Sequence, residues 1–420
     1  MKKDIEQYGL ALAKNSKKAA QIVRVLPLEI RNRVLLLAAK KLRQEVPAIL
    51  KANAKDIESS INLISEAMID RLTLSPDSIE AMAKGVEEIA AFDDPLNKVL
   101  EEKTLDNGMT LSRVAVPIGS VFFIYESRPN VTIDGAALCF KSGNAVILRG
   151  GKESIHSSTL LANIFRSALK ENDIDENAVQ LVNTPDRSLM TNLLQMTAYI
   201  DLVIPRGGEN LIKTVVEQSR IPVIKHFNGI CHIYIDKSAD MTKVAPILVN
   251  AKTQRVGVCN AMECVLINRD IDDKAVEAFI APLREKGVEM LGDAEAQKRV
   301  PGVQDIGEDS NYHREYLALK MNVKFVEDAA DACEHIEKYS SRHTDAIIAE
   351  DQAIQDYFVK NVDSSSVMVN ASTRFADGGE YGLGAEVGIS TDKLHARGPM
   401  GVESLCTYKW VLRGNGQIRS

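Results

Sequence analysis

From Val121 onward, short apolar segments alternate with amphipathic helical ones, and this alternation restricts the possible folds more than any other feature of the sequence. Strand-like runs include VFFIYES, AVILRGG, VQLV, DLVIPRGG and PVIKHF, and helical patterns such as SSTLLANIFRSALK separate them. A second series follows, with strands expected near ECVLIN, NVKFVED, TDAIIAE and SSVMVN. Strands and helices that alternate at this spacing form right-handed βαβ units around a parallel sheet, so we predict an α/β fold.

The length of the chain indicates two domains, because 420 residues exceed the size at which a single hydrophobic core keeps growing. We expect two Rossmann-like parallel-sheet domains that meet near residue 230. The first would comprise residues 1–230 and the second residues 231–365. Residues 366–420 would return to the first domain and end in a tail strand, CTYKWVLRG.

The first hundred residues have a different character, with apolar residues three or four positions apart, the spacing of amphipathic helices. Ser75-Pro76-Asp77 has the composition of a helix start. Residues 101–117 then form two short alternating runs around Asn107-Gly108, a pair typical of tight hairpins. We interpret this hairpin as an arm for oligomer contacts, and a plain surface ribbon is a comparable alternative.

Composition argues against several classes of partner. The formal net charge is −7 without long single-sign runs, which disfavours nucleic acid and anionic membranes as main partners. An uninterrupted apolar stretch of about 18 residues is absent, so no segment is expected to span a membrane. The six cysteines lack CxxC or other metal-ligand spacing, so we predict no metal and expect a reducing, cytoplasmic compartment.

Two loops at the expected carboxyl ends of strands, where parallel sheets bind ligands, have the composition of phosphate-binding loops. Residues 149–154 (RGGKES) follow AVIL, and residues 205–210 (PRGGEN) follow DLVI. Glycines permit close approach to the backbone, and a cation in each loop suits a negative charge. Each loop alone is as easily an ordinary glycine turn, but two in successive units favour a dinucleotide. The residues concerned are Arg149, Gly150, Gly151, Lys152, Ser154, Arg206, Gly207 and Gly208.

Cys259 differs from the other cysteines in its surroundings. It lies in QRVGVCN, a polar, glycine-containing segment between the helical stretch VAPILVNAK and the strand ECVLIN, where a thiolate could meet a ligand. Cys139, Cys264 and Cys406 lie in apolar patterns and are expected in the core, the usual place of a free cysteine. Loop position alone favours Cys259 as a nucleophile only modestly.

Five blocks of the sequence closely resemble one family. They are SVFFIYESRPNVTIDGAALCFKSGNAVILRGG, PVIKHFNGICHIYID, QRVGVCNAMECVLIN, NASTRFADGGEYGLGAEVGIST and KLHARGPMGVESL. Each resembles a segment of the γ-glutamyl phosphate reductases, a branch of the aldehyde dehydrogenase superfamily, and the likeness is collinear from about residue 20 to residue 410. No amino-acid kinase domain precedes these blocks, so we expect the free-standing reductase.

The resemblance implies an aldehyde dehydrogenase fold, with residues 1–230 as the NADP-binding domain and residues 231–365 as the catalytic domain. It also implies that Cys259 is the nucleophile and that NADPH reduces L-glutamate 5-phosphate to L-glutamate 5-semialdehyde in proline biosynthesis. A thiolate that displaces phosphate from a mixed anhydride gives a thioester, which can accept hydride. Glu315 matches the family glutamate that holds the nicotinamide ribose; without the family match, a solvated charge is an equal alternative.

Two departures from other members of the superfamily bear on the reaction. Oxidising members carry Glu-Leu-Gly-Gly-Lys, whose glutamate activates water, whereas this chain has Lys225-His226-Phe227-Asn228-Gly229. The missing acid favours reduction over hydrolysis, unless Glu263 or Glu386 supplies a base or Lys225 and His226 merely finish a strand. The second departure is Lys152, which stands where NAD-preferring relatives have an acid and suits the 2′-phosphate of NADP. Arg149 could read that phosphate instead.

The groups around the reacting carbonyl are less sharply defined. Developing negative charge on its oxygen calls for donors such as the backbone N–H of Cys259 and a side-chain amide. Oxidising relatives place an asparagine two residues before a proline, and here Asn130 follows Pro129 instead, so Asn130 is a candidate donor or a local turn-former. The phosphate and the α-carboxylate of the substrate also need partners. We expect them among Arg128, His226, His343 and Arg374.

Two other functions stay open from the sequence. Another acyl reductase of the superfamily, such as an acyl-CoA reductase, would keep Cys259 and the cofactor loops but would need no basic pocket. A non-catalytic scaffold could keep the fold, although intact Cys259, Lys152 and Glu315 argue against it. We also expect a homo-oligomer paired through the hairpin and tail strand, and the upstream glutamate kinase is a candidate partner.

Overall fold

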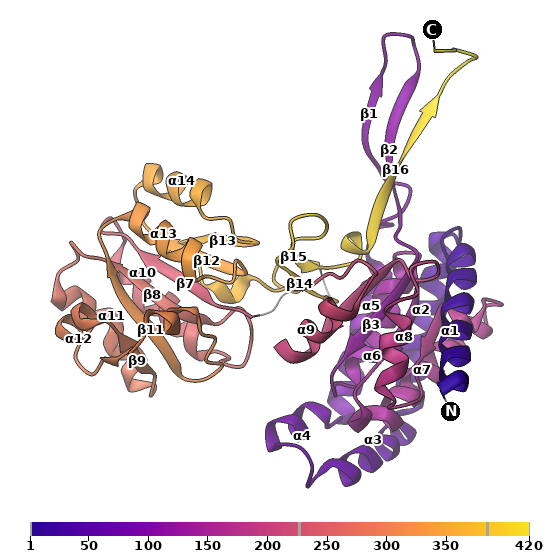
Figure 1. Cartoon of the computed structure of the whole chain (residues 1–420), viewed down its shortest axis with the longest axis horizontal. Coiled ribbons are helices and arrows are strands. Elements are labelled where there is room, and N and C mark those ends of the chain that lie inside the picture. Colours follow the sequence, from indigo (N-terminus) through magenta and orange to yellow (C-terminus); the bar gives the residue numbers. More distant parts are fainter. Residues whose placement is uncertain (1, 226–227, 384–385, 420) are drawn as a thin grey trace. The chain divides into compact units, whose positions relative to one another are not determined.

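The computed structural model describes residues 2–225, 228–383 and 386–419, and the chain divides into two compact units. Unit 1 comprises Met1–Lys225, Gly382–Gly388 and Met400–Ser420, and unit 2 comprises His226–Tyr381 and Ile389–Pro399. The predicted return segment, residues 366–420, is therefore shared between the two units. Each unit is built on its own parallel sheet, as Figure 1 shows.

The sheet of unit 1 has four strands in the order β5-β4-β3-β6, and all of its neighbouring strands are parallel. β3 is buried along its whole length because both faces of the sheet are covered, which explains its continuous apolar run. Phe122 and Ile124 pack with residues of α1 and α8, whereas Phe123 packs against Gly135 of α6. This strand order is half of a Rossmann fold, and its winding reverses between β3 and β6. The strands are β3 (Ser120–Tyr125), β4 (Ala145–Arg149), β5 (Val179–Leu181) and β6 (Leu202–Arg206).

The helices of unit 1 include the one whose start the sequence predicted. Ser75 caps α5 by accepting a hydrogen bond from the backbone N–H of Ser78 at 3.1 Å, and Pro76 occupies the first turn, which confirms the prediction. The helices are α1 (Lys2–Val23), α2 (Leu28–Gln44), α3 (Val46–Ser60), α4 (Glu66–Leu72), α5 (Pro76–Ala91), α6 (Asn130–Lys141), α7 (Ile155–Lys170), α8 (Arg187–Leu193) and α9 (Glu209–Gln218).

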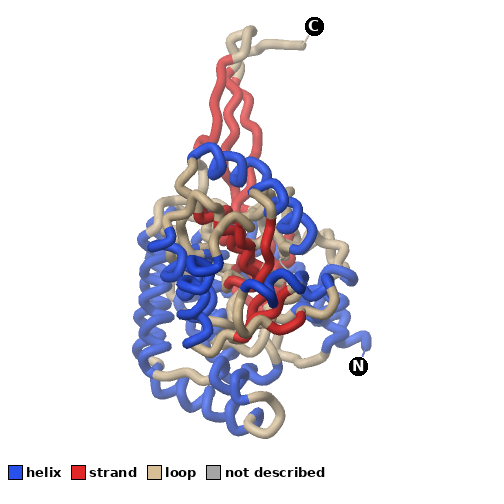
Figure 2. The backbone as a smooth tube through the Cα atoms, turned by 90° about the vertical axis from the view of Figure 1, so that its left-hand side faces the viewer, coloured by secondary structure: helices blue, strands red, loops and turns tan. Residues whose placement is uncertain are grey.

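An antiparallel arm also belongs to unit 1. It consists of β1 (Val99–Thr104), β2 (Thr110–Pro117) and β16 (Cys406–Arg413), in the order β1-β2-β16. Gly108 has a φ of 80°, a left-handed conformation that favours glycine, and the predicted hairpin at Asn107-Gly108 is confirmed. The pairing of β16 with β2 confirms the predicted tail strand. Figures 1 and 2 show the arm extending away from the rest of unit 1, with the C-terminus near its tip.

The sheet of unit 2 has seven strands in the order β10-β9-β11-β8-β7-β12-β13, all parallel to their neighbours. Successive residues of β8 face opposite sides: Val265 belongs to the core that contains residues of α10 and α11, and Leu266 to the core that contains residues of α13. The strands are β7 (Cys231–Ile235), β8 (Met262–Asn268), β9 (Glu289–Gly292), β10 (Gln304–Asp305), β11 (Lys320–Val326), β12 (Thr344–Ile348) and β13 (Ser366–Val369). The helices are α10 (Met241–Thr253), α11 (Asp273–Glu285), α12 (Ala294–Arg299), α13 (Ala329–Tyr339) and α14 (Gln352–Asn361).

Some details differ from the sequence prediction. PVIKHF does not form a sheet strand: Val223 makes an isolated bridge with Val203, and Pro222 has no N–H with which to extend the pairing. Residues 226 and 227 of that segment lie outside the described residues. The short strands β9 and β10 were not predicted, and neither was the two-stranded sheet of β14 (Gly388–Ser390) and β15 (Gly398–Met400). Among residues 2–225, 228–383 and 386–419, no helix combines the length and apolar character that crossing a bilayer requires.

Candidate active site

Cys259 lies in unit 2, in the loop between α10 and β8. It is half-buried, whereas the other five cysteines are buried, so it is the most accessible thiol of the six. The loop is fixed at the next residue, Asn260. Its side-chain Nδ2 donates to the backbone carbonyl of Ala376 at 2.9 Å, and its backbone carbonyl accepts from Thr373 Oγ1 at 2.7 Å. A rigid backbone therefore holds a thiol that solvent can still reach.

The Cys259 loop lies at the amino ends of the parallel strands of unit 2. It directly precedes β8, and Gly229 directly precedes the neighbouring strand β7. Ligands of open α/β sheets usually bind beyond the carboxyl ends, which is the rule that we applied to the sequence. In unit 2, the most accessible thiol is instead carried by a loop that enters a strand.

The segment before β7 packs directly on the Cys259 backbone. A Cβ atom on Gly229 would overlap the carbonyl of Cys259, so a glycine is required at this close approach. The Cys231 thiol donates to the same carbonyl, with an Sγ to O distance of 3.2 Å. The backbone N–H of Gly229 donates to Glu315 Oε1 at 2.9 Å. Glu315, predicted to hold the nicotinamide ribose, is thus brought beside the Cys259 loop.

A buried ion pair spans the two flanks of this loop. Lys252, near the end of α10, lies 2.8 Å from Glu263 at the start of β8, and both side chains are inaccessible to solvent. Burial raises the pKa of Glu263 to about 7, and the ammonium group of Lys252 opposes that shift. Burial lowers the pKa of Lys252. Glu263 is therefore enclosed and engaged, which makes it a poor base for activating water.

Among the predicted substrate ligands, Arg374 contacts the start of the Cys259 loop. It belongs to the short 3-10 helix Thr373–Phe375, and its Nε donates to Gln254 Oε1, at the start of the Cys259 loop, at 2.7 Å. Burial lowers the pKa of Arg374, and the negative charges of Asp377 and of a Cys259 thiolate oppose that shift. A guanidinium here offers a positive charge to both the thiolate and an anionic substrate.

The two histidines proposed as substrate ligands do not gain support. His343 is fully buried before β12, and its Nδ1 lies 2.8 Å from Thr344 Oγ1, so it presents no surface to a substrate in this conformation. The reason is that this end of β12 is enclosed, which its sequence pattern did not reveal. His226 lies outside the described residues.

Unit 2 also contains a buried group of potential metal ligands. The ligating atoms of His232, Cys264 and His335 lie within 4.8 Å of one another, and 4.0 Å separates Cys264 Sγ from His335 Nε2. Ligands around tetrahedral zinc are about 3.3–3.8 Å apart, given bond lengths of about 2.0–2.3 Å, and a structural site uses four of them. We interpret the three residues as a buried polar contact, and the absence of a metal stays a prediction.

In unit 1, the glycines of both predicted phosphate loops pack against the turn after β3. A Cβ atom on Gly151 would lie 2.5 Å from Ser127 Oγ, and one on Gly207 would lie 2.6 Å from the carboxyl carbon of Glu126. Glu126 Oε1 also accepts the backbone N–H of Gly208, at the start of α9, at 2.9 Å. These glycines are thus explained by close approach of the chain to itself, at the place where the winding of the sheet reverses.

The N-terminus of α7 is likewise occupied by the chain's own carboxylate. Asp56 of α3 accepts the backbone N–H groups of His156 and Ser157 at 3.0 and 2.8 Å, so α7 does not offer these donors to a phosphate. Arg149 is the better anion partner in this region. Its half-buried side chain has no hydrogen-bond partner for Nε among the described residues, and burial, aided by Arg187, lowers its pKa. Lys152 is exposed three residues later.

The remaining predicted residues of unit 1 have partners within the unit. Ser154 is buried and donates to the carbonyl of Gly151 at 3.2 Å. Arg206 lies 3.6 Å from Glu386. Asn130 Nδ2 donates to Asp134 Oδ2, one turn later in α6, at 3.2 Å, which favours the turn-former interpretation of Asn130.

Sequence reasoning missed several residues next to the predicted ones. The predicted Arg128 is exposed in the turn after β3. Its neighbour Ser127, which was not predicted, is buried, and its hydroxyl donates to Glu153 Oε2 at 2.7 Å. Ser127 stands two residues before Pro129, the position at which oxidising relatives have asparagine, and this spacing could have identified it. Cys231 and Glu126 carried no such signal, because their roles depend on contacts between distant parts of the chain.

Comparisons with known proteins agree with the fold and show the family. The model of the aldehyde dehydrogenase family matches residues 3–298. The chain is 46% identical over 417 residues to the γ-glutamyl phosphate reductase of Paramagnetospirillum magneticum, covering 99% of this chain and 98% of that protein. It is 47% identical over 419 residues to that of Desulfotalea psychrophila, covering 99% and 100%. The crystal structure of γ-glutamyl phosphate reductase from Thermotoga maritima superposes with a TM-score of 0.96 at 39% identity, covering 98% of this chain and 100% of that one.

Two parallel-sheet units, one of them carrying an accessible loop cysteine, together with the family match, define an aldehyde dehydrogenase-type oxidoreductase that uses a nicotinamide cofactor. Within that class, the near-complete relatives show that the chain belongs to the γ-glutamyl phosphate reductase family. The fold class and the family inferred from the sequence are therefore confirmed.

Proposed function

We propose that the chain reduces L-glutamate 5-phosphate to L-glutamate 5-semialdehyde with NADPH, releasing phosphate, as a step of proline biosynthesis. The observation that carries the proposal is the accessible Cys259 thiol on a rigid loop, in a chain of this family. Arg374 beside the same loop supplies the positive charge that an acyl phosphate requires.

In the proposed mechanism, the Cys259 thiolate attacks the acyl carbon of the substrate. The carbon–oxygen bond to phosphate breaks, phosphate departs with the electron pair, and a thioester forms on Cys259. Bound NADPH would supply a hydride to the thioester carbon. The backbone N–H of Cys259 would stabilise the oxyanion, and the thiolate then leaves to release the aldehyde.

The residues of unit 1 fit an anionic dinucleotide, and we assign NADP binding to this unit. Arg149, a partly buried cation whose Nε has no hydrogen-bond partner among the described residues, is suited to a phosphate group. Lys152 adds an exposed positive charge for the 2′-phosphate. Glu315, in unit 2, is also a proposed cofactor ligand, through the nicotinamide ribose. Catalysis is assigned to unit 2.

Both alternative acids for hydrolysis are engaged in ion pairs, Glu263 with Lys252 and Glu386 with Arg206. The thioester should therefore wait for hydride. Without NADPH, the acyl phosphate should give one stoichiometric burst of phosphate and then stop. Steady phosphate release above an enzyme-free control and a Cys259→Ala control would show that another group activates water.

The reverse reaction tests the proposed function directly. Glutamate 5-semialdehyde, inorganic phosphate and NADP⁺ are mixed with the enzyme, and the absorbance of NADPH is followed. We expect NADPH formation only when phosphate is present. Activity with coenzyme A in place of phosphate would support the acyl-CoA reductase alternative. NADPH formation when phosphate and coenzyme A are both left out would indicate a hydrolytic dehydrogenase. No turnover with any acceptor would support the scaffold alternative.

We also propose that two copies of the chain pair through the arm. On the edge strand β16, Tyr408, Trp410 and Leu412 stand at alternate positions and are each about half exposed, so they form a contiguous apolar row of the kind that a partner covers. Replacing Trp410 with lysine should shift the mass measured by light scattering toward the monomer.

The compartment and the upstream partner are proposals of the same kind. The six free cysteines are consistent with a reducing cytoplasm. An upstream glutamate kinase would have reason to hand over a labile acyl phosphate directly. Co-purification of the kinase with this chain would test that contact.

A further inference from the structure

We propose that Asp345 is a positioning residue for Cys259: it fixes the segment Gly229–His232, on which the Cys259 backbone rests, and thereby sets the reactivity of the thiol. Asp345 is the fully buried second residue of β12 and was not singled out from the sequence. The inference rests on the proposed function only in taking Cys259 as the nucleophile.

The first step is the contact between this segment and Cys259. The Cα of Gly229 packs so closely against the Cys259 carbonyl that no side chain fits there. The Cys231 thiol donates to that same carbonyl at 3.2 Å. Because both contacts fall on the main chain of Cys259, a displacement of the segment would displace the nucleophile itself.

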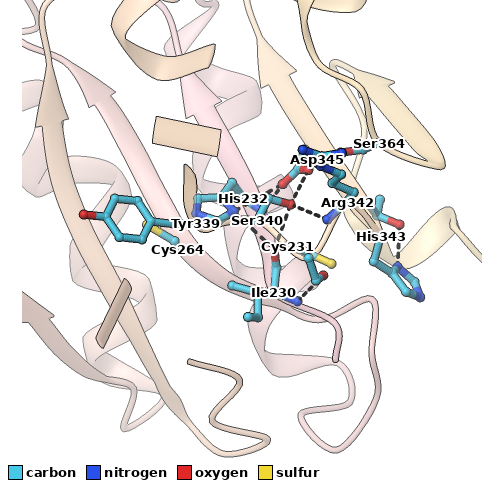
Figure 3. A network of polar contacts seen from close by, with 12 residues as sticks. Ile230, Cys231, His232, Cys264, Tyr339, Ser340, Arg342, His343, Asp345 and Ser364 are labelled. Atoms are coloured by element: carbon cyan, nitrogen blue, oxygen red, sulfur yellow. Dashed lines mark hydrogen bonds and ion pairs between the residues drawn. The ribbon is translucent and has the colours of Figure 1, made fainter. Parts of the chain in front are cut away.

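The second step is what holds the segment. Its backbone N–H groups are bound by side chains: Glu315 accepts from Gly229 at 2.9 Å, Ser341 Oγ from Ile230 at 2.8 Å, and Asp345 Oδ1 from His232 at 2.8 Å. Cys231 and His232 are also held by strand pairing, with β8 for both residues and with β12 for His232, but the side-chain acceptors are the part that a substitution can alter. Figure 3 shows Asp345, Ser340 and His232 in one network of polar contacts that extends to Ile230.

The third step is the saturation of the Asp345 carboxylate. Its Oδ1 accepts the N–H of His232 and lies 3.2 Å from His232 Nδ1. Its Oδ2 accepts the hydroxyls of Ser340 at 2.7 Å and Ser364 at 2.5 Å. A carboxylate has about four acceptor positions, and here donors approach all of them, which makes a fully buried charge tolerable.

The carboxylate is also what orders its neighbours. The Ser340 hydroxyl has a single proton, which it donates to Asp345. Its oxygen can therefore accept the backbone N–H of Arg342, at 2.9 Å. His232 Nδ1, between Asp345 and the carbonyl of Ile230, lies 3.2 Å from each. Replacing Asp345 by asparagine would place an NH₂ group where Oδ2 accepts the two serine hydroxyls, so both hydroxyls would have to accept instead. Ser340 would then direct its proton to the carbonyl of Ile230, 3.3 Å away, which changes the contacts that hold the segment.

The test compares Asp345→Asn with Asp56→Asn. Asp56 is a matched control in unit 1: it is 1% exposed and accepts from His156 N, Ser157 N and Ser157 Oγ, and these contacts are all within unit 1, whereas Cys259 belongs to unit 2. The measurements are Tm, kcat and KM, and the second-order rate of Cys259 alkylation by iodoacetamide on the folded enzyme. The other five cysteines are buried and should react slowly.

We expect both variants to lose Tm, and only Asp345→Asn to lose at least tenfold in kcat and at least fivefold in alkylation rate, with the KM for NADPH unchanged. Asp56→Asn should stay within twofold of wild type in both rates. Alkylation and kcat within twofold of wild type for Asp345→Asn would overturn the proposal and leave Asp345 a purely structural residue. Alkylation needs no turnover, so it decides this point even if Cys259→Ala were to show that Cys259 is not the nucleophile.

If Asp345→Asn does not fold, Ser364→Ala takes its place. Ser364 is half-buried and donates to the far oxygen of Asp345 without touching the segment. Removing its hydroxyl should slow alkylation and turnover about threefold, in parallel. Unchanged rates in a folded Ser364→Ala variant would equally overturn the proposal.

Discussion

The two units place their candidate functional loops at opposite ends of their parallel strands. In unit 1, the loops after β3, β4 and β6 meet at the carboxyl ends, at the point where the winding reverses. In unit 2, Cys259 and Gly229 lie at the amino ends of β8 and β7. In both units a glycine stands where the candidate loop comes closest to a neighbouring segment of the chain. Gly151 packs on the side chain of Ser127, and Gly229 packs on the backbone of Cys259.

This difference has a physical basis. A strand-to-helix loop at a carboxyl end exposes the first turn of a helix, so it suits an anion and can be recognised from composition. A helix-to-strand loop at an amino end has no such dipole in its favour, and its geometry must come from contacts with neighbouring segments. Unit 2 supplies those contacts from side chains distant in sequence, such as Asp345 and Glu315.

Cys259→Ala should show the largest difference between the two units, because it should abolish catalysis in unit 2 and spare cofactor binding in unit 1. We expect the loss of activity to be on the order of 10³-fold or more, because the nucleophile is absent, while NADPH binding to unit 1 is retained. Turnover assays and fluorescence titration with NADPH measure the two properties. The buried Cys139 of unit 1 and Cys264 of unit 2 serve as controls, whose alanine variants should cost stability on the order of a kcal/mol and preserve the chemistry. Activity of Cys259→Ala within tenfold of wild type would refute covalent catalysis.

Alanine substitutions at Gly229 and Gly151 compare how tightly the candidate loop is packed in each unit. Gly229→Ala should lower kcat by about 10²-fold, since its Cβ meets backbone that must shift and a displacement of about 1 Å is that costly. Gly151→Ala meets chiefly the side chains of Ser127 and Glu153, which can rotate, so it should raise the KM for NADPH several-fold and leave Cys259 alkylation unchanged. The comparison fails if Gly151→Ala impairs alkylation as much as Gly229→Ala does.

Cofactor preference tests whether unit 1 alone reads the 2′-phosphate. Lys152→Glu should shift the NADPH to NADH ratio of kcat/KM about tenfold toward NADH, because a charge-assisted bond to phosphate is replaced by repulsion. Arg149→Gln should shift the ratio if the partly buried Arg149 is the main reader, and comparing the two variants separates these roles. An unchanged ratio in both variants would remove this loop from 2′-phosphate recognition.

The smallest expected effect concerns acid stability, because the three buried histidines of the described residues all belong to unit 2. Burial, aided by the charges of His232, Lys324 and Lys338, lowers the pKa of His335 to about 2. The unfolded chain protonates this ring below about pH 6.5 and the folded chain does not, so its contribution to stability falls as pH decreases, by up to about 1.4 kcal/mol per pH unit.

The matched pair for this effect is His335→Gln in unit 2 and His156→Gln in unit 1. Urea unfolding at pH 7.5, 6.5 and 5.5 gives the stability difference between each variant and wild type. For His335→Gln the difference should shrink as pH falls, because only wild type carries the buried ring. His156 is exposed, so its variant should show a constant difference. A constant difference for His335→Gln would mean that its ring is solvated in the folded chain.

Local pattern alone determined a large part of this protein. The alternation of strands and helices, the Asn107-Gly108 hairpin, the Ser75 cap and the loop position of Cys259 all follow from residues close in sequence, whose periodicity and backbone preferences act locally. The five blocks further determined the family.

Tertiary structure alone decided how these parts are supported. It placed Cys259 at the amino ends of its sheet, put the carboxylate of Asp56 at the start of α7, enclosed His343, and brought Asp345 to His232 at the start of β7. Asp345 lies in TDAIIAE, which reads as an ordinary buried strand. The proposed role of Asp345 comes from a set of donors at residues 232, 340 and 364, which lie 113, 5 and 19 positions away, and contacts at such irregular spacings leave no periodic signal in the sequence.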